Sequence, residues 1–562
     1  MPSMSLQIPI LALIGLVTSW LRRRFFVASS LSNLPGPPSP SWLRGHMDKL
    51  FHAQGWDFHL KDIVEYGTAV RLRGFLGEDV LYLTDPEGLR HILTRDHEDI
   101  YDEPPMIIER NKLLWGHGLL SSTGSAHRKQ RHALNPAFST SRLSDVLPIF
   151  YAITHKLEDR LVEILRFGPA EIDMLIWMSR VSLELIGQAG IGVSFDNLTT
   201  DSPPNKYMVA VKQLIPLAFP LQGFMRLIPY IVKLGSPRLR GFLAGIAPHP
   251  NIRKLKEIIY FLYETNSSVY RKRLDDLSKG DDAAKTMIGN GKDIISILIK
   301  ENAALPQTER LTDDEIISTI GTLVFAGQDT TSVALSRILH TLALDQERQQ
   351  KLRQELQQSL SHDYLFRDLV DLQYLDAVCK ETLRVYIFAS HTASSRVSKL
   401  AHSPGTLSIN DVYSVLRSPR KDAVIPLCRP VRGKNGTPIE KVMVQAGTMV
   451  VVGAAAVNRD PLIWGPDAHL WRPERWLEPM LTSTTDARLP GVYSNIMSFM
   501  GGGRSCIGFR FAEMEIKVIL LILIPRFKFE ISDKNIVWKM FNFATPTVHD
   551  TPSLPLQVTY LG

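Results

Sequence analysis

A glycine-rich segment near the end of the chain has the residue types needed to hold a metal-bound sulfur. It reads FMGGGRSCIG, where Cys506 follows Arg504 and stands between Gly502 and Gly508. A metal-bound thiolate is anionic and needs N–H donors or a nearby cation. The glycines permit positive φ and let backbone amides approach the sulfur, while Phe499 can shield it and a helix after Gly508 can turn its positive end toward it. The alternative is an inert thiol in a flexible loop.

Asp329 and Thr330 form an acid–hydroxyl pair within the sequence AGQDTT. A threonine in mid-helix tends to donate to the carbonyl four residues earlier, here Ala326, and this bends the helix. A carboxyl group beside such a hydroxyl can hold and pass protons. The alternative is an acid–threonine pair on a solvated helix face.

Charged residues recur at helical spacing elsewhere in the chain. His127 and Arg131 are four residues apart, and Glu381 and Arg384 are three apart, so each pair can share one helix face. Arg475, in the sequence PERW, can join the second pair. Such pairs are common in proteins, so they are informative only through their order along the chain and the other motifs that occur with them.

Taken in order, these motifs resemble those of the cytochrome P450 family of haem-thiolate monooxygenases, in its fungal microsomal type. The match at F-x-x-G-x-R-x-C-x-G is complete, and A-G-Q-D-T-T, E-x-x-R and P-E-R-W precede it in the family's order. The resemblance covers nearly the whole chain after residue 40. It implies haem b (iron protoporphyrin IX) as cofactor, with Cys506 as the axial ligand of the iron.

The resemblance also implies roles for the other residues. Thr330 and Asp329 would act in catalysis by supplying protons for O–O cleavage. Glu381, Arg384 and Arg475 would form a structural charge network behind the haem. The haem would be held by Cys506, His127, Arg131, Arg396, Arg504, Phe499, Gly502 and Gly508, with the histidine and the arginines facing its propionates.

The elements that must position these residues are mainly helical. Short β-rich runs occur at 69–72 and 80–83, and helical periodicity dominates from Ser139 to about Lys300. Thr312 and Glu315 have the spacing of a capping box, so the helix that carries Asp329 is expected to begin there and to run to about Leu344. The predicted fold class is mainly α with a small β region, a cytochrome P450 fold on an N-terminal membrane anchor.

Residues 1–24 are predicted to be that anchor. The run from Leu6 to Leu21 is almost wholly apolar, and three arginines follow it, which places the body of the chain in the cytosol by the positive-inside rule. A core helix or a cleaved signal peptide is the alternative. Residues 25–40 form a basic, proline-rich hinge and residues 41–562 the catalytic domain. The expected location is the endoplasmic reticulum membrane, with a single span.

Two segments fit the pattern less simply. The apolar stretch 214–246 is a substrate-entry wall, a second membrane contact, or core.

Residues 397–422 form a long polar stretch between Arg396 and the following strand, whereas in relatives only a few residues connect the corresponding strands. Either a surface insertion, which costs little closure entropy, or an intron retained in the gene model explains it. Removing roughly 397–417 is expected to leave haem incorporation intact or improved.

Composition narrows the class of protein. The net charge of +7 over 562 residues is a mild excess that suits an acidic partner or a membrane and is no nucleic-acid signature. Three cysteines are too few for a disulfide framework, and the absence of C-x-x-C spacing argues against a thiolate zinc site. Cys379 and Cys428 are expected to be ordinary thiols.

The resemblance implies the reaction as well. The chain is expected to insert one oxygen atom from O2 into a lipophilic substrate, a terpenoid or other fungal secondary metabolite, with electrons from NADPH through a membrane-bound NADPH-cytochrome P450 reductase. The alternatives are a broad-specificity xenobiotic-oxidising monooxygenase, a reductase-independent haem-thiolate isomerase or dehydratase, and a form inactivated by the 397–422 insertion. Thr330 speaks against the isomerase, since members of that type often lack the threonine.

Overall fold

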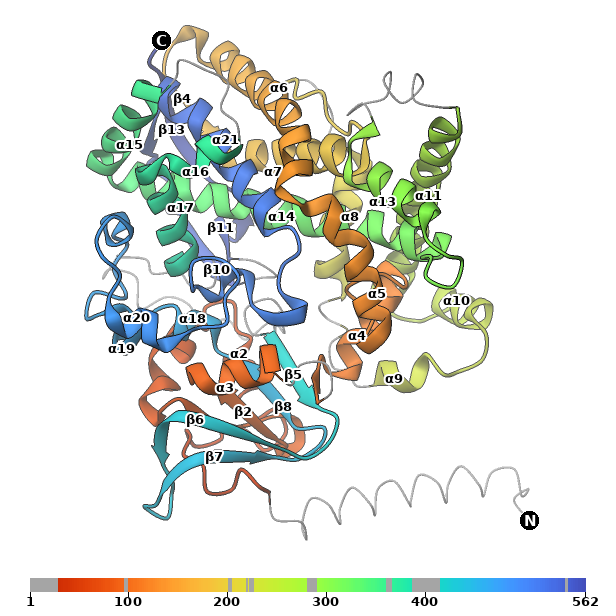
Figure 1. The fold of residues 1–562 in the computed structure, drawn as a ribbon, viewed down its shortest axis with the longest axis vertical. Helices are drawn as coiled ribbons and strands as arrows, with labels where there is room; N and C mark the ends of the chain where they lie inside the picture. Colours follow the sequence, from red (N-terminus) through yellow and green to blue (C-terminus); the bar gives the residue numbers. More distant parts are fainter. Residues whose placement is uncertain are drawn as a thin grey trace.

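Helix α14, Asp313–Leu344, runs through the middle of the molecule (Figure 1) and is buried along most of its length. Its first turn is the predicted capping box. The Glu315 N–H donates to Thr312 Oγ1 at 3.3 Å, and the Thr312 N–H donates to Glu315 Oε2 at 2.8 Å. The helix ends at Leu344, as expected from its periodicity. Both apolar and polar side chains of this helix are buried, because other elements pack around it.

The computed structural model describes residues 29–95, 100–200, 205–218, 221, 227–279, 291–359, 366–386, 415–540 and 544–562. Its helices are α2 (Met47–Leu50), α3 (Pro86–Arg90), α4 (Pro105–Trp115), α5 (Gly124–Leu134), α6 (Thr140–Ile164), α7 (Met174–Leu185), α8 (Lys206–Ala218), α9 (Ile228–Ile231), α10 (Pro237–Gly245), α11 (Pro250–Ser278), α13 (Ile294–Ala304), α14, α15 (Gln346–Ser359), α16 (Phe366–Asp371), α17 (Gln373–Tyr386), α18 (Ala454–Val457), α19 (Pro461–Trp464), α20 (Thr482–Ala487) and α21 (Phe509–Arg526). The predicted class, mainly helical with a small β region, is confirmed.

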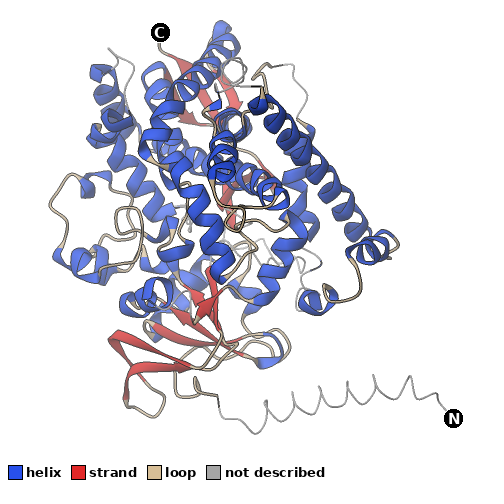
Figure 2. Cartoon of the chain, turned by 45° about the vertical axis from the view of Figure 1, so that its right-hand side comes forward, coloured by secondary structure: helices blue, strands red, loops and turns tan. Residues whose placement is uncertain are grey.

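The strands gather mostly at one end of the molecule (Figure 2). A five-stranded sheet has the order β1-β2-β8-β5-β3, and β6 and β7 form a hairpin beside it. At the opposite end β4, β13 and β9 form a separate sheet, whereas β10, β11 and β12 form a third sheet nearer the middle of the molecule (Figure 1). The bounds are β1 Ala69–Arg73, β2 Asp79–Leu83, β3 Tyr101–Asp102, β4 Ala170–Asp173, β5 Val415–Pro419, β6 Ala423–Arg432, β7 Pro438–Val444, β8 Met449–Val452, β9 Phe527–Ile531, β10 Val537–Met540, β11 Ala544–Val548, β12 Thr551–Pro552 and β13 Pro555–Tyr560.

The proline-rich segment is attached to the sheet rather than held away from it. Leu31 and Leu34 are buried in the core, and the Arg71 N–H of β1 donates to the Pro35 carbonyl at 2.8 Å. The described part of the predicted hinge, residues 29–40, is therefore irregular but docked. The predicted anchor, residues 1–24, lies outside the described residues. Within the part of the chain that the structure describes, no helix has both the length and the apolar character to cross a membrane.

The apolar stretch 214–246 is largely exposed where it is described beyond α8. Tyr230, Leu234, Phe242 and Ile246 are 68%, 56%, 62% and 62% exposed. Core is therefore the wrong interpretation for residues 227–246, because α9 and α10 have no layer of described residues over these side chains. The other two interpretations stay open.

The structure shortens the predicted insertion at its C-terminal end. Residues 397–414 lie outside the described residues, but β5 follows at Val415, inside the predicted range 397–422. Val415 and Arg417 pair with Val452 and Val450 of β8, and on its other edge β5 pairs with β3. This end of the segment is therefore a sheet strand rather than a surface loop.

Candidate active site

The loop that carries Cys506 is closed by contacts within the chain. The Cys506 N–H donates to the Phe499 carbonyl at 2.9 Å, and the Phe499 ring meets Tyr493 edge to face at 5.6 Å between centroids. Gly502 has φ of +74°, and a β-carbon there would stand 1.6 Å from the Leu93 carbonyl oxygen. Glycine is therefore required at 502, both for its conformation and for the close approach of the Leu93 backbone.

Gly508 departs from the expectation made for it. Its φ is −91°, so positive φ is not the reason for a glycine there. The nearest atom to an added β-carbon would be Phe138 Cε1 at 3.6 Å, an ordinary contact. The Gly508 backbone amide nevertheless acts on the sulfur and lowers the pKa of the Cys506 thiol. Helix α21 begins at the next residue, so its N-terminus lies beside the cysteine.

Arg131 supplies the cation near the sulfur. Its Nη1 donates to the Ser505 carbonyl at 2.7 Å and its Nη2 to Ser505 Oγ at 3.0 Å. Burial raises the pKa of the Cys506 thiol more than the Gly508 amide and Arg131 lower it. The expected donors are present but do not ionise the thiol by themselves, whereas coordination to a metal cation deprotonates it.

Cys506 differs from the other two cysteines in its surroundings. Its side chain has accessible surface, yet burial is the largest influence on the pKa of its thiol and raises it. Both observations fit a residue that lines an opening inside the molecule. Cys379 is buried. The Cys428 thiol lies 3.4 Å from the Asp85 carboxylate, and burial together with that carboxylate raises its pKa to about 11. Neither has the setting of a metal ligand.

The acid–threonine motif interrupts the burial of α14. Thr330 Oγ1 donates to the Ala326 carbonyl at 2.6 Å, the bond that its place in mid-helix predicts. Ala326 and Thr330 are both exposed, although the helix is buried from Ile316 to Val324 and again from Thr331. One helical turn of a central helix therefore has accessible surface. Phe325, beside that turn, packs on Trp115 of α4 with centroids 4.3 Å apart.

Asp329 is suited to hold a proton. Burial raises the pKa of its carboxyl, and Lys212 of α8 lowers it in part. A carboxyl group with a raised pKa beside a hydroxyl is a common arrangement for general acid–base chemistry. Lys212 was not predicted, because no sequence spacing links it to residue 329.

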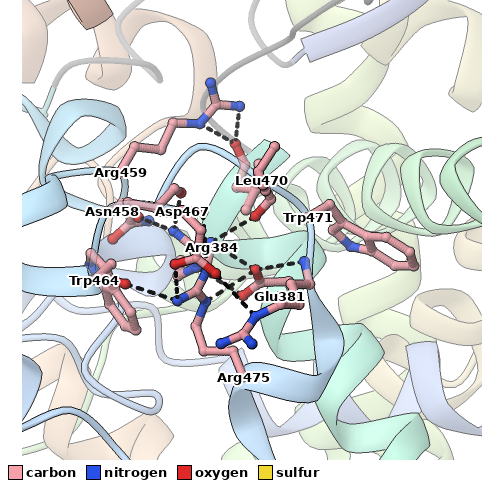
Figure 3. A network of polar contacts seen from close by, with 12 residues as sticks. Glu381, Arg384, Asn458, Arg459, Trp464, Asp467, Leu470, Trp471 and Arg475 are labelled. Atoms are coloured by element: carbon pink, nitrogen blue, oxygen red, sulfur yellow. Dashed lines mark hydrogen bonds and ion pairs between the residues drawn. The ribbon is translucent and has the colours of Figure 1, made fainter.

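Glu381 and Arg384 pair as their spacing predicts, and both are fully buried (Figure 3). Arg384 Nη2 donates to Glu381 Oε1 at 2.7 Å, and Arg475 Nε donates to the same oxygen at 3.4 Å. Arg384 Nη1 also donates to the Asn458 and Ala468 carbonyls, each at 2.7 Å. The charges are thus paired and the backbone between the two motifs is held in place.

Asn458 links this network to the cysteine loop. Its carbonyl accepts from Arg384, while its side chain accepts from the Met497 N–H at 2.8 Å and donates to Ser498 Oγ at 3.1 Å. Ser498 Oγ in turn donates to the Leu383 carbonyl at 2.7 Å. The residues just before Phe499 are therefore positioned by α17.

Arg504, two residues before the cysteine, is held by acids. It lies 2.8 Å from Asp102 and 3.7 Å from Glu103, and its Nη2 donates to the Ser122 carbonyl at 2.7 Å. Asp102 also pairs with Arg420, just after β5. This cluster joins β3, β5 and the cysteine loop. No sequence motif predicted that Asp102 and Glu103 would lie there.

Comparison with known proteins places these features in one family. The family model described as Cytochrome P450 matches residues 35–410 and 420–554. Cytochrome P450 monooxygenases 81 and 91 of Postia placenta are 40% and 38% identical, and each alignment covers 96% of this chain and 95% and 96% of the relative. A ganoderic acid synthetase of Ganoderma lucidum is 38% identical over 99% of this chain and 98% of its own length. The chain belongs to the cytochrome P450 family of monooxygenases.

The P450 family implies a haem, and the donors of this chain fit one. Cys506 offers an accessible sulfur, the ligand type that thiolate-bound iron requires. Arg131 and Arg504 lie near it, and their positive charge would suit the carboxylates of a porphyrin. When bound, the haem supplies an iron centre whose thiolate ligand favours O–O cleavage, and the protein sets access, orientation and proton delivery.

The residues predicted to hold the P450 haem are only partly brought together. His127 is buried on α5, one turn before Arg131. Arg131, Arg504, Phe499, Gly502 and Gly508 all belong to or touch the cysteine loop. Arg396 lies outside the described residues.

Arg417 is a candidate that the sequence reasoning missed. It is 3% exposed, on β5. Burial lowers the pKa of its guanidinium. Glu103 and Asp102 raise that pKa and Arg504 lowers it, so Arg417 belongs to the same charged cluster as Arg504. The apolar pair Val415 and Leu416, shortly before the hairpin of β6 and β7, was the available signal for a strand there.

Proposed function

We propose that this P450 inserts one oxygen atom from O2 into a lipophilic, terpenoid-type substrate, with electrons from NADPH through a membrane-bound reductase. The observation that carries this proposal is the accessible surface at Cys506 and on one turn of α14 at Ala326 and Thr330, within elements that are otherwise buried. A thiolate ligand and an acid–hydroxyl pair are what the reaction requires of the protein. Thr330 and Asp329 would position and supply protons, while Cys506 holds the iron.

The substrate class rests on chemistry and on one relative. Trp115 and Phe325 pack together beside the accessible turn of α14, and such aromatic groups favour an apolar substrate. One relative, similar over nearly its full length, is named a ganoderic acid synthetase, which supports a terpenoid-like substrate here. A broad-specificity xenobiotic oxidase is the competing possibility.

The proposed location is the endoplasmic reticulum membrane, with the catalytic domain in the cytosol. Besides the apolar run at residues 6–21, the exposed side chains of α9 and α10 support a membrane contact. Between Asp201 and Glu257 the chain has nine lysines and arginines and no acidic residue. Basic charge beside exposed aromatic and aliphatic groups suits the headgroup region of an anionic bilayer. Fractionation of cells expressing the chain with and without residues 1–24 tests the location.

Carbon monoxide difference spectra and product analysis test the function. The reduced full-length chain should give the thiolate band, Cys506→Ala should lose it, and Cys428→Ala, the matched control at the other exposed cysteine, should keep it. Co-expression with a reductase and feeding of a terpenoid panel should then give a product that gains one oxygen atom from labelled O2. Product formed without NADPH and reductase would favour an isomerase or dehydratase. A thiolate band with product only from xenobiotics would favour the broad-specificity oxidase.

A further inference from the structure

Lys212, on α8, carries a positive charge without a counter-charge. Its side chain is exposed, and no hydrogen bond or ion pair joins it to another residue in the part of the chain that the structure describes. No acidic residue occurs between Asp201 and Glu257, so none stands three or four positions away on the helix, where a local partner would lie. The ammonium group of Lys212 can therefore bind a ligand.

Helix α8 is held close to α14 by its first buried residue, Tyr207. Tyr207 Oη donates to Asn266 Oδ1 of α11 at 2.7 Å, and both residues are buried. The amide nitrogen of Asn266 would stand 2.7 Å from a β-carbon at Gly321 of α14. Because Gly321 has no side chain, α11 can approach α14 closely and bring α8 with it.

A second set of contacts leads from Tyr207 to the accessible turn of α14. The Tyr207 ring packs on Phe195 with centroids 5.2 Å apart. A β-carbon at Gly187 would stand 2.7 Å from the Phe195 ring, and a β-carbon at Gly327 would stand 2.8 Å from Ile186. Ile186 and Gly187 are adjacent in sequence, so a short path of packed residues connects α8 to that turn.

Lys212 lies on the side of α8 that faces this turn. Met208, one helical turn earlier on the same face, is 9% exposed and so packs against other residues. Among the described residues, Lys212 is the charged group that acts on Asp329, and it lowers the pKa of that carboxyl. Such an effect weakens with distance, so the two groups lie near each other, although they form no direct ion pair. Burial raises the pKa of Asp329, which makes it a poorer counter-charge for the lysine than an ordinary aspartate.

We propose that Lys212 binds the carboxylate of a lipophilic acid, which makes the substrate a terpenoid acid in the proposed function, on which this inference rests. Trp115 and Phe325 beside the accessible turn suit an apolar body, and the ammonium of Lys212 suits one anionic end. A carboxylate carries a single charge, as the lysine does, whereas a phosphate monoester carries nearly two and would call for a second cation. Lys212 thereby determines which end of the substrate lies away from Thr330.

Binding to the purified, haem-loaded full-length protein tests this inference without turnover. Mono-, di- and triterpenoid carboxylic acids and their methyl esters are titrated at neutral pH, with calorimetry and the shift of the haem absorption band as readouts. At least one acid should bind about tenfold more tightly than its ester. Lys212→Met should abolish this preference and leave the affinity for the ester unchanged, and Lys212→Arg should keep the preference. Lys206→Met, which removes an exposed lysine at the start of the same helix, is the matched control and should also keep it.

Three results would overturn the proposal. The first is a panel in which no acid binds more tightly than its ester, and the second is a preference that survives in Lys212→Met. The third is an equal loss in Lys206→Met, because the general positive charge of α8 would then be responsible. The carbon monoxide band shows whether each variant folds, and Lys212→Gln takes the place of Lys212→Met if the latter does not.

Failure of the proposed function would look different. A preference for acids without any oxygenated product would count against the proposed function alone. Oxygenated product from neutral terpenoids, with no acid preferred in binding, would count against the role of Lys212 alone.

Discussion

Thr330 has an exposed side chain on a central helix, and its hydroxyl donates to the Ala326 carbonyl of the same helix. Thr330→Val keeps the shape but removes the hydroxyl, so we expect product formation to fall about 100-fold while NADPH consumption continues as peroxide release. Product and peroxide per NADPH, measured with a reductase, check this.

Thr341→Val is the matched control for that experiment. Thr341 lies on the same helix and makes the same type of bond, from Oγ1 to the Arg337 carbonyl at 2.8 Å, but it is buried away from the accessible turn. It should leave the product-to-peroxide ratio near that of wild type. Equal losses in the two variants would mean that the hydroxyl bends the helix and does nothing more.

Arg417 is expected to be needed for haem retention. It is buried beside Arg504, where a cation can meet a propionate. Arg417→Ala should release haem to an acceptor protein at least about tenfold faster, equivalent to about 1.4 kcal/mol. Arg432→Ala, at an exposed position of β6, should release haem at the wild-type rate. A wild-type rate for Arg417→Ala would return the predicted role to Arg396.

Individual site residues differed in how far the sequence could locate them. Cys506, Thr330, Glu381 and Arg384 were found because their partners lie within a few residues. The acidic partners of Arg504 are Asp102 of β3 and the next residue, Glu103, about four hundred residues earlier. Glu515 is fully buried on α21, and its neighbours Ser182 and Thr331 lie on α7 and α14. A glutamate in an apolar helical run was the available signal for Glu515. Long-range packing decides such contacts, and no local spacing encodes them.

Helix α17 and the segment 458–476 behave as one unit, because Glu381 accepts from Arg384, Arg475 and Trp476. Glu381→Gln removes the carboxylate that pairs with the buried Arg384 and leaves Arg475 paired with Asp467 alone, so the free energy of unfolding should fall by about 3–5 kcal/mol. Urea denaturation measures it. Glu478→Gln, at a pair with Arg472 in which the glutamate side chain is 54% exposed, should cost about 1 kcal/mol or less. Similar losses in both variants would contradict this account of the network.

Strand β5 sets the boundary for removing the inserted segment. Deletion of 397–412 spares the pairing of Val415 and Arg417 with β8, and we expect it to preserve or raise the carbon monoxide band. Deletion of 397–417 removes Arg417 and part of the strand, so we expect it to lower the band, in contrast to the expectation from sequence. Haem content per protein, compared between the two deletions, checks the boundary. A lower band after the shorter deletion would show that the inserted residues support the fold.

Helices and strands were predicted best where residues close together in the sequence mark their ends. The capping box at Thr312 located the start of α14, and apolar periodicity located its end. Periodicity could not tell whether the apolar face of 227–246 has a partner, and with respect to the described residues several large apolar side chains of that face are exposed. The strand at 415–419 was missed because it follows a polar stretch and depends on pairing with distant β8.

The stability of the whole molecule should depend on pH through the titration of Glu515. The pKa of its carboxyl is raised from 4.5 to about 8 in the folded state, so the folded state binds the extra proton. Its contribution to stability is therefore full below pH 4.5 and is lost as the pH rises through about 8. The loss is at most about 5 kcal/mol, at 1.36 kcal/mol per pKa unit. Thermal midpoints measured from pH 5 to 9 should fall less steeply with rising pH in Glu515→Gln than in wild type. Parallel curves would contradict the raised pKa.

At the scale of the whole molecule, fold class and family followed from the order of the motifs, whereas the arrangement of the sheets did not. Strand β4 has no neighbour in sequence with which to pair. Its partner is β13, where Ile172 faces Leu556, and the Met174 N–H donates to the Leu554 carbonyl at 2.9 Å.

That pairing has a consequence for synthesis on the ribosome. Residues 170–173 emerge early, but the strand that completes their sheet is translated only at 555–560. The cysteine loop, at 499–508, also emerges late. Final folding and haem capture must therefore follow translation of nearly the whole chain, and contacts of such long range form slowly. A nascent chain halted before residue 555 should be unable to close this sheet and should depend on chaperones until synthesis resumes.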